Sequence, residues 1–169
     1  MANGTLLRSN AAMNTLDRFD RQLLNLVQDD ASQTAEALAA SVSLSVSAIQ
    51  RRLRQLREAG VITRHIAVVD PQRIEKNTTF VVSLQLEKER PELMAPLRHW
   101  LAQQPHVQQA YYVTGEFDYV LIITAPDVDT YDALMASLLQ ANPSIKRFTT
   151  NVALNVVKRG LAIPLALEE

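Results

Sequence analysis

Apolar residues recur at helical spacing along three stretches of the N-terminal third of the chain. A spacing near 3.6 residues predicts an amphipathic helix with one buried face. The three stripes are Leu16, Phe19, Leu23, Leu26 and Val27, then Ala35, Leu38, Ala39 and Val42, and then Val46, Ile49, Leu53 and Leu56. Only Ser43-Leu44-Ser45 separates the second stripe from the third, and Gly60 follows the third, where glycine commonly ends a helix. The pattern predicts three short helices, the last two joined by a tight turn.

The period changes after Gly60. Residues 61–69 are rich in β-branched side chains, which favours a short strand or wing before a polar linker that runs from residue 71 to 78. Beyond the linker, alternating apolar residues predict a strand from residue 80 to 86. The remaining segments favour a helix over 91–104, strands over 107–114 and 117–125, a helix from 127 to 142 and a strand over 145–157. The order βαββαβ is the ferredoxin-like arrangement.

The predicted fold class is therefore α+β, with an N-terminal winged helix-turn-helix followed by a ferredoxin-like βαββαβ domain, an αβ sandwich. We predict a flexible leader (1–15), a winged helix-turn-helix domain (16–64), a strand and linker (65–78), the ferredoxin-like domain (79–157) and a C-terminal tail (158–169). Cores of about 50 and 80 residues are marginal by themselves. We therefore expect the second domain to dimerise.

The third predicted helix separates apolar from polar side chains by angle. At 100° per residue, its apolar residues face the core while Ser47, Gln50, Arg51 and Arg54 lie on the far side. Arginine can pair bidentately with guanine, glutamine with adenine, and serine with either a base or a phosphate. The predicted DNA contacts are Ser45, Ser47, Gln50, Arg51, Arg54, Arg57 and Arg64. The alternative is that this basic face only contacts solvent. We interpret the charged residues of the first helix, Asp17 and Asp20 among them, as a solvated face of that kind and not as a site.

Composition narrows the class of protein. The chain has 17 Lys and Arg against 18 Asp and Glu, so its basic character is local, with five arginines and one acid between residues 51 and 64. Cysteine is absent, which excludes disulfides, thiolate metal sites and cysteine nucleophiles. The three histidines are scattered without metal-ligand spacing, and no catalytic or cofactor motif is present, so we predict no enzyme, metal or cofactor. No apolar run approaches the length of a membrane helix, which favours a cytoplasmic protein without a membrane partner.

Three segments carry a family resemblance when they are taken together and in order. They are LDRFDRQLLNLVQDD, LAASVSLSVSAIQRRLRQLREAGVI and VTGEFDYVLIITAPD. From Leu16 to Lys158 the chain resembles the Lrp/AsnC (feast/famine) transcription regulators. The resemblance implies a DNA-binding winged helix-turn-helix, and a ferredoxin-like domain that dimerises and senses small molecules, often amino acids. The chain departs from the family at Ser43, where glycine is usual, at Glu116, where aspartate is common, and by lacking a proline near the start of the third helix.

The predicted hairpin around Gly115 is the candidate effector site. Glycine tolerates positive φ at a turn, and free N–H groups there can hold a carboxylate. Asp118 or Glu116 could pair with an ammonium group, so that one hairpin offers partners for both ends of an amino acid. The predicted effector residues are Thr114, Gly115, Glu116, Phe117, Asp118, Tyr119 and Thr150, of which Tyr119 either lines the pocket or packs in the core. The alternative is that the hairpin is only a turn.

These observations predict a sequence-specific transcription regulator that responds to a small metabolite, an amino acid by preference, through altered assembly or DNA affinity. The expected partners are double-stranded DNA, the effector and a second copy of the chain, with assembly to tetramers or octamers implied by the resemblance. Two alternatives stay open. One is an architectural DNA-binding protein without an effector, and the other is a metabolite-binding module or enzyme on the ferredoxin-like half.

Overall fold

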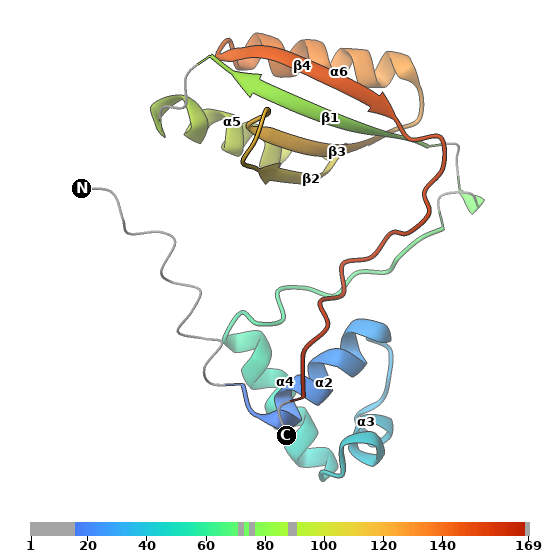
Figure 1. Ribbon diagram of the computed structural model, residues 1–169. Helices are drawn as coiled ribbons and strands as arrows, with labels where there is room; N and C mark the ends of the chain where they lie inside the picture. Colours follow the sequence, from blue (N-terminus) through green and yellow to red (C-terminus); the bar gives the residue numbers. More distant parts are fainter. Residues whose placement is uncertain (1–15, 71–72, 75–76, 88–90, 168–169) are drawn as a thin grey trace. The chain divides into compact units, whose positions relative to one another are not determined.

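The computed structural model describes residues 16–70, 73–74, 77–87 and 91–167, and the predicted leader 1–15 lies outside them (Figure 1). The chain divides into two units. The first holds the described residues up to Ala67 together with 159–167, and the second holds those from Val68 to Lys158. The predicted C-terminal tail is therefore part of the first unit. Within the described residues, no helix is long and apolar enough to cross a membrane.

The first unit is built on three helices, α2 (Arg18–Asp29), α3 (Ala35–Val42) and α4 (Val46–Glu58) (Figure 1). Each begins after a polar residue whose side chain accepts a backbone N–H of the first turn: Asp17, Thr34 and Ser45. Such caps satisfy amide groups that have no partner within the helix. The predicted apolar stripes meet in one core, whose buried members are Leu23, Leu38, Ala39, Val42, Ile49 and Leu53. The three predicted helices are confirmed.

The turn between α3 and α4 depends on a strained residue. Ser43 ends α3 with φ 59° and ψ 42°, in the left-handed region that favours glycine. Relief of about 1–2 kcal/mol of strain, less about 0.5 kcal/mol for the freer unfolded chain, leaves an expected gain of about 0.5–1.5 kcal/mol for Ser43→Gly. Urea unfolding measures this gain. Ser43→Ala is the control, because it removes the hydroxyl without relieving φ, and an equal gain in that variant would contradict the explanation.

Of the strand or wing predicted over residues 61–69, the strand does not form. Residues 61–70 contain no strand, although their side chains are of the β-branched kind that favours one. The apolar members are largely exposed, with Ile66 51% and Val68 85% accessible. A strand needs a partner for its N–H and C=O groups. No strand of the described chain pairs with this segment, which shows that side-chain type alone does not make a strand.

The second unit is a four-stranded antiparallel sheet with two helices. Its elements are β1 (Thr78–Leu86), α5 (Pro91–Gln103), β2 (Val107–Tyr112), β3 (Tyr119–Ala125), α6 (Val128–Ala141) and β4 (Ile145–Val152). The strand order is β2-β3-β1-β4, which confirms the ferredoxin-like prediction. However, β4 stops at Val152 and not at residue 157. Val152 pairs with Phe80, the third residue of β1, and the Ala153 N–H still donates to the Thr79 carbonyl at 2.9 Å. Only Thr78 of β1 lies beyond that bond, so residues 154–157 have almost no strand left to pair with.

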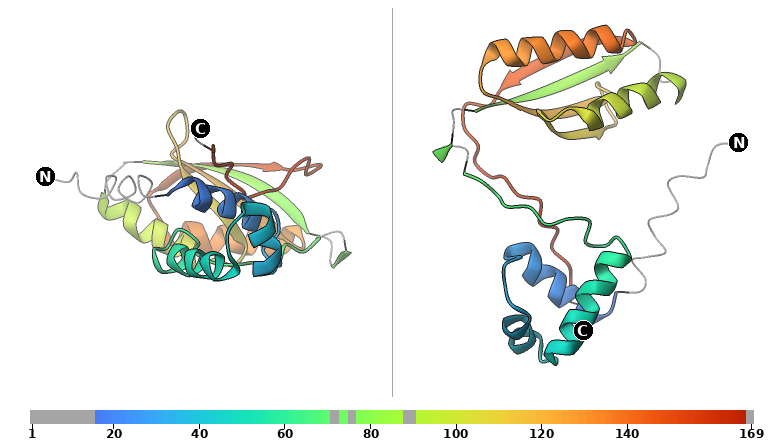
Figure 2. Two further views of the ribbon diagram at one scale, coloured as in Figure 1. Left: turned by 90° about the horizontal axis from the view of Figure 1, so that it is seen from below. Right: turned by 180° about the vertical axis from the view of Figure 1, so that it is seen from behind.

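Both helices lie on one face of the sheet, as the rear view in Figure 2 shows. Alternate residues of β1 and β3 are buried on this face, and the Phe80 ring stacks on Tyr131 of α6 at 4.0 Å between centroids. Residues at the intervening positions, such as Val81 and Ile122, are only half-buried on the other face. Neither α5 nor α6 covers that second face (Figure 2).

Candidate functional site

The exposed side of α4 gathers the polar residues predicted to contact DNA. Ile49, Leu53 and Leu56 are buried on one side of the helix. The predicted contacts, all of them exposed, are Ser45, Ser47, Gln50, Arg51, Arg54, Arg57 and Arg64. Arg64 lies just beyond the helix. Among the described residues, none of the four arginines in this set forms an ion pair with an acid. Their charges therefore remain available to an anionic partner.

A hollow lies at the C-terminal end of α4, next to these arginines. It measures about 350 Å³ and is lined by Arg57, Ile62, Thr63, Arg64 and His65. Two arginines and one histidine are thus among its five lining residues. Phosphate oxygens suit such a concave basic surface, because arginine offers them planar paired donors.

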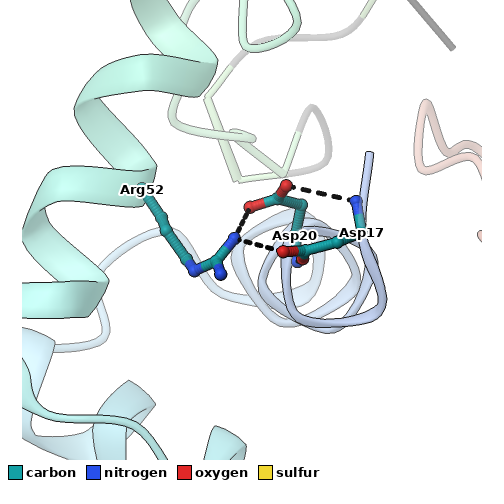
Figure 3. A network of polar contacts seen from close by, with 3 residues as sticks. All are labelled: Asp17, Asp20 and Arg52. Atoms are coloured by element: carbon teal, nitrogen blue, oxygen red, sulfur yellow. Dashed lines mark hydrogen bonds and ion pairs between the residues drawn. The ribbon is translucent and has the colours of Figure 1, made fainter. Parts of the chain in front are cut away.

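Arg52 does not belong to this exposed face. Its Nη1 lies 2.8 Å from a carboxylate oxygen of Asp17 and 2.8 Å from one of Asp20 (Figure 3). The guanidinium also lies 5.5 Å from the centre of the Phe19 ring. The interpretation of Asp17 and Asp20 as a solvated face is therefore wrong. Asp17 caps α2, and both carboxylates join α2 to α4 through Arg52.

This ion-pair network also changes the acidity of Asp17. Burial by itself would raise the pKa of that carboxyl group. Hydrogen bonds from the Asp20 backbone and from Arg52, together with the positive charge of Arg52, outweigh burial and lower the pKa below its ordinary 3.8. Asp17 therefore stays ionised, and paired with Arg52, to lower pH than a free aspartate would.

The hairpin between β2 and β3 has the turn geometry expected of it. Gly115 has φ 122°, which side chains rarely adopt. The Val113 N–H donates to the Asp118 carbonyl at 2.9 Å, and the Asp118 N–H donates to the Leu84 carbonyl at 2.9 Å. In addition, the Asp118 carboxylate accepts the Leu86 N–H at 2.6 Å. Asp118 therefore fastens the hairpin to the end of β1, a structural role that the sequence did not indicate.

The tip of the hairpin carries charge and free amide groups. The Glu116 carboxylate lies 2.8 Å from Nη2 of Arg147 on β4, and the Arg147 guanidinium lies 5.4 Å from the centre of the Phe117 ring. Thr114 and Gly115 are exposed. Within the part of the chain that the structure describes, the N–H groups of residues 115–117 have no hydrogen-bond partner. The tip thus combines unused donors with one carboxylate and one guanidinium.

Two of the predicted effector residues lie apart from this tip. Tyr119 is 2% exposed and packs in the sheet core, where its hydroxyl accepts a hydrogen bond from Nε of Arg98 at 3.2 Å. Thr150 pairs with Val82 in the sheet, and its hydroxyl is hydrogen-bonded to the hydroxyl of Tyr131. Both side chains therefore point to the helix-covered face. The structure brings together Thr114, Gly115, Glu116, Phe117 and Asp118 but not these two.

The geometry defines a class of protein, a helix-turn-helix unit with a free basic face linked to a ferredoxin-like unit. Comparison with known proteins agrees. A winged helix-turn-helix DNA-binding domain matches residues 16–63, and an Lrp/AsnC ligand-binding domain matches residues 79–163. The chain belongs to the Lrp/AsnC family of transcription regulators, which have a DNA-binding and a ligand-binding domain.

Individual relatives cover nearly the whole chain. An uncharacterised HTH-type transcriptional regulator of Sinorhizobium fredii is 38% identical over 152 residues, which is 90% of each protein. Among solved structures, an AsnC family regulator from Agrobacterium tumefaciens is 29% identical with a TM-score of 0.79, covering 88% of this chain and 97% of that one. A Neisseria meningitidis regulator in complex with L-Met shares the fold, with 23% identity and a TM-score of 0.78, covering 89% of this chain and 97% of that one.

Proposed function

We propose that the protein binds specific double-stranded DNA sequences through α4 and changes its assembly or DNA affinity when an amino acid binds the second unit. The observation that carries the DNA part is the exposed face of α4. Arg51 and Arg54 lie there without ion-pair partners among the described residues, beside Gln50 and Ser47. Arg57 and Arg64 line the hollow beside this face and serve as phosphate contacts. A regulator that acts on chromosomal DNA works in the cytoplasm.

The effector part of the proposal centres on the hairpin tip. The free N–H groups of residues 115–117, with Arg147 beside them, suit a carboxylate, while Glu116 and Asp118 suit an ammonium group. Tyr119 and Thr150 then act indirectly, through the sheet core. The L-Met complex of the meningococcal regulator supports an amino acid as the class of effector.

The face of the sheet that α5 and α6 leave uncovered suits a homodimer interface. Val81, Val120 and Ile122 are half-buried there, and Tyr111 is 50% exposed. A second copy packed on this face would bury them and would present two copies of α4 to DNA. The operator would then contain two half-sites separated by about one helical turn or a multiple of it. Higher assemblies, tetramers or octamers, would build on this dimer.

Two other functions are distinguished by one pair of experiments. Selection of duplexes from a random pool tests sequence-specific DNA binding, and a thermal-shift screen of the twenty amino acids tests the effector, since any ligand of the native state stabilises it. An architectural protein would bind DNA and show no shift with any amino acid. A metabolite-binding module or enzyme would show a shift and select no duplex. The absence of both responses would reject the proposed function.

Asp118→Asn is expected to abolish the amino-acid-dependent thermal shift. The amide oxygen can still accept the Leu86 N–H, so the hairpin stays in place while the charge that would face an ammonium group is lost. The intrinsic melting temperature should change little, because a substitution that keeps the structural contact costs about 0.5 kcal/mol or less. The measurement is a thermal melt with and without the amino acid found in the screen.

Asp127→Asn is the matched control for this prediction. Asp127 caps α6 by accepting the Thr130 N–H, a role that asparagine also performs, and it lies outside the hairpin. The control should keep the full ligand-dependent shift. An unchanged shift in Asp118→Asn would show that the hairpin aspartate does not bind the ammonium group.

A further inference from the structure

The C-terminal arm, residues 161–167, is bound to the first helix of the DNA-binding unit by two side-chain carboxamides. Nδ2 of Asn25 donates to the Leu165 carbonyl at 2.9 Å, and the Leu165 N–H donates to Oδ1 of Asn25 at 3.0 Å. Nε2 of Gln28 donates to the Ile163 carbonyl at 3.0 Å, and the Ile163 N–H donates to Oε1 of Gln28 at 2.8 Å. Each carboxamide therefore satisfies both backbone groups of one arm residue.

The spacing of the two carboxamides on α2 matches the spacing of the backbone groups that they bind on the arm. Asn25 and Gln28 are three residues apart on α2 and so lie on one side of the helix. Ile163 and Leu165 are two residues apart, so in an extended chain their backbone groups face the same way. Pro164, between them, has no N–H that could be left without a partner. The Asn25 contacts are partly buried and the Gln28 contacts are exposed, so Asn25 is the stronger attachment.

The arm gives the DNA-binding unit a second connection to the ligand-binding unit. The first connection runs from Ile62, which packs against the helical core, to Thr78 at the start of β1. The second runs from Ala153, just after β4, to Ile163 on α2. Both leave the sheet at the same place, because the Ala153 N–H donates to the Thr79 carbonyl at 2.9 Å. They reach the first unit at two different helices.

Chain length makes the C-terminal connection the shorter one. Thr78 is sixteen positions after Ile62, and Ile163 is ten positions after Ala153. At no more than about 3.5 Å per residue, the first can extend to about 55 Å and the second to about 35 Å. The arm therefore limits how far the two units can separate. Two attachment points also prevent the free rotation that a single linker would allow.

We propose that the C-terminal arm, held by Asn25 and Gln28, is a tether through which the ligand-binding unit restrains the DNA-binding unit. In a dimer, this restraint keeps the two copies of α4 at a spacing suited to two half-sites. Binding to both half-sites then loses less freedom than it would with loosely linked units. Because residues 153–160 alone join β4 to the arm, a change at the sheet reaches α2 through this tether. The expected effect on binding to two half-sites rests on the proposed function. The restraint of one unit by the other does not.

The mechanical test is small-angle X-ray scattering of the full chain without DNA. Asn25→Ala/Gln28→Ala removes the attachment from the helix, and Leu165→Pro removes one of its N–H donors from the arm without touching the helices. Both variants are expected to gain about 10–20 Å in maximum dimension, the difference in reach between the two connections. Gln22→Ala and Leu165→Ala are the controls, since the hydrogen bonds between the described arm and α2 involve Asn25 and Gln28 and not Gln22, and Leu165→Ala keeps the N–H. Unchanged dimensions in both attachment variants would overturn the proposal.

The DNA test compares duplexes carrying one and two half-sites, selected with the wild-type chain. Both attachment variants should lose about tenfold in the preference for two half-sites and keep their affinity for one. An equal loss on both duplexes would indicate damage to the DNA-binding unit, and no loss on either would indicate that the arm does not restrain it; each result overturns the proposal. If the wild-type chain selects no duplex, the proposed function fails, and scattering alone decides whether the arm is a tether.

Discussion

Replacing Arg51 or Arg54 by alanine is expected to weaken binding to the selected DNA by about 1–3 kcal/mol each, the usual value for an arginine that reads a base. Both lie on the exposed face of α4, opposite the buried Ile49 and Leu53. Neither has an ion-pair partner among the residues that the structure describes, so the folded state should be unaffected. Gel-shift titrations on the selected duplex and on a random duplex measure the loss of affinity and of specificity.

Arg57→Ala provides the comparison for that result. Arg57 lines the hollow at the end of α4, where it faces phosphate and not the base edges in the proposed binding mode. The substitution should therefore weaken binding to both duplexes about equally. It should also reduce the slope of log affinity against log salt concentration by about one. If Arg51→Ala and Arg54→Ala both leave affinity intact, the DNA-binding surface is on another helix or another face.

The exposed face of α4 was predictable because it depends on local pattern. The apolar spacing of Val46, Ile49, Leu53 and Leu56 fixes which side of the helix is buried, and the polar residues opposite follow by angle. The end of α4 was predictable for the same reason, since Gly60, with φ 70°, lies just beyond it. Such features need only a few neighbouring residues, and the sequence displays those directly.

Contacts between distant segments were not predictable from local pattern. Arg52 lies between the two faces of α4 by angle, and its partner Asp20 is 32 residues away. Asn25 and Leu165 are 140 residues apart, and nothing in the sequence of α2 distinguishes a carboxamide that binds backbone from one that is solvated. The tail therefore gave no signal of its attachment. The strand prediction for residues 61–69 failed for a different reason. The local pattern favours a strand there, but the described chain offers no other strand to pair with it.

Arg52→Met is expected to lower the free energy of unfolding of the DNA-binding unit by about 1–3 kcal/mol at pH 7, since it removes one partner of a partly buried ion-pair network. Methionine is unbranched and apolar and lacks the guanidinium that lies over the Phe19 ring, so the loss comes mainly from the charge. The Asp20 side chain is only 15% exposed and would be left without its counterion. Urea unfolding followed by circular dichroism measures the change. The single tryptophan, Trp100, lies in α5, so its fluorescence reports on the other unit and should not shift.

The same variant should lose part of the acid sensitivity of the protein. The pKa of Asp17 is lowered in the folded state, so its contribution to stability is present above the unfolded pKa and is lost as pH falls through the lowered value. Wild-type stability should therefore fall as the pH drops below about 5, and the stability of Arg52→Met, in which Arg52 no longer lowers that pKa, should fall less steeply. Arg54→Met is the matched control on the same helix. It should change stability by about 0.5 kcal/mol or less and should lose DNA affinity, so the two neighbouring arginines give opposite results. Equal stability of Arg52→Met and Arg54→Met at pH 7 would show that the contacts of Arg52 with Asp17 and Asp20 contribute nothing to the fold.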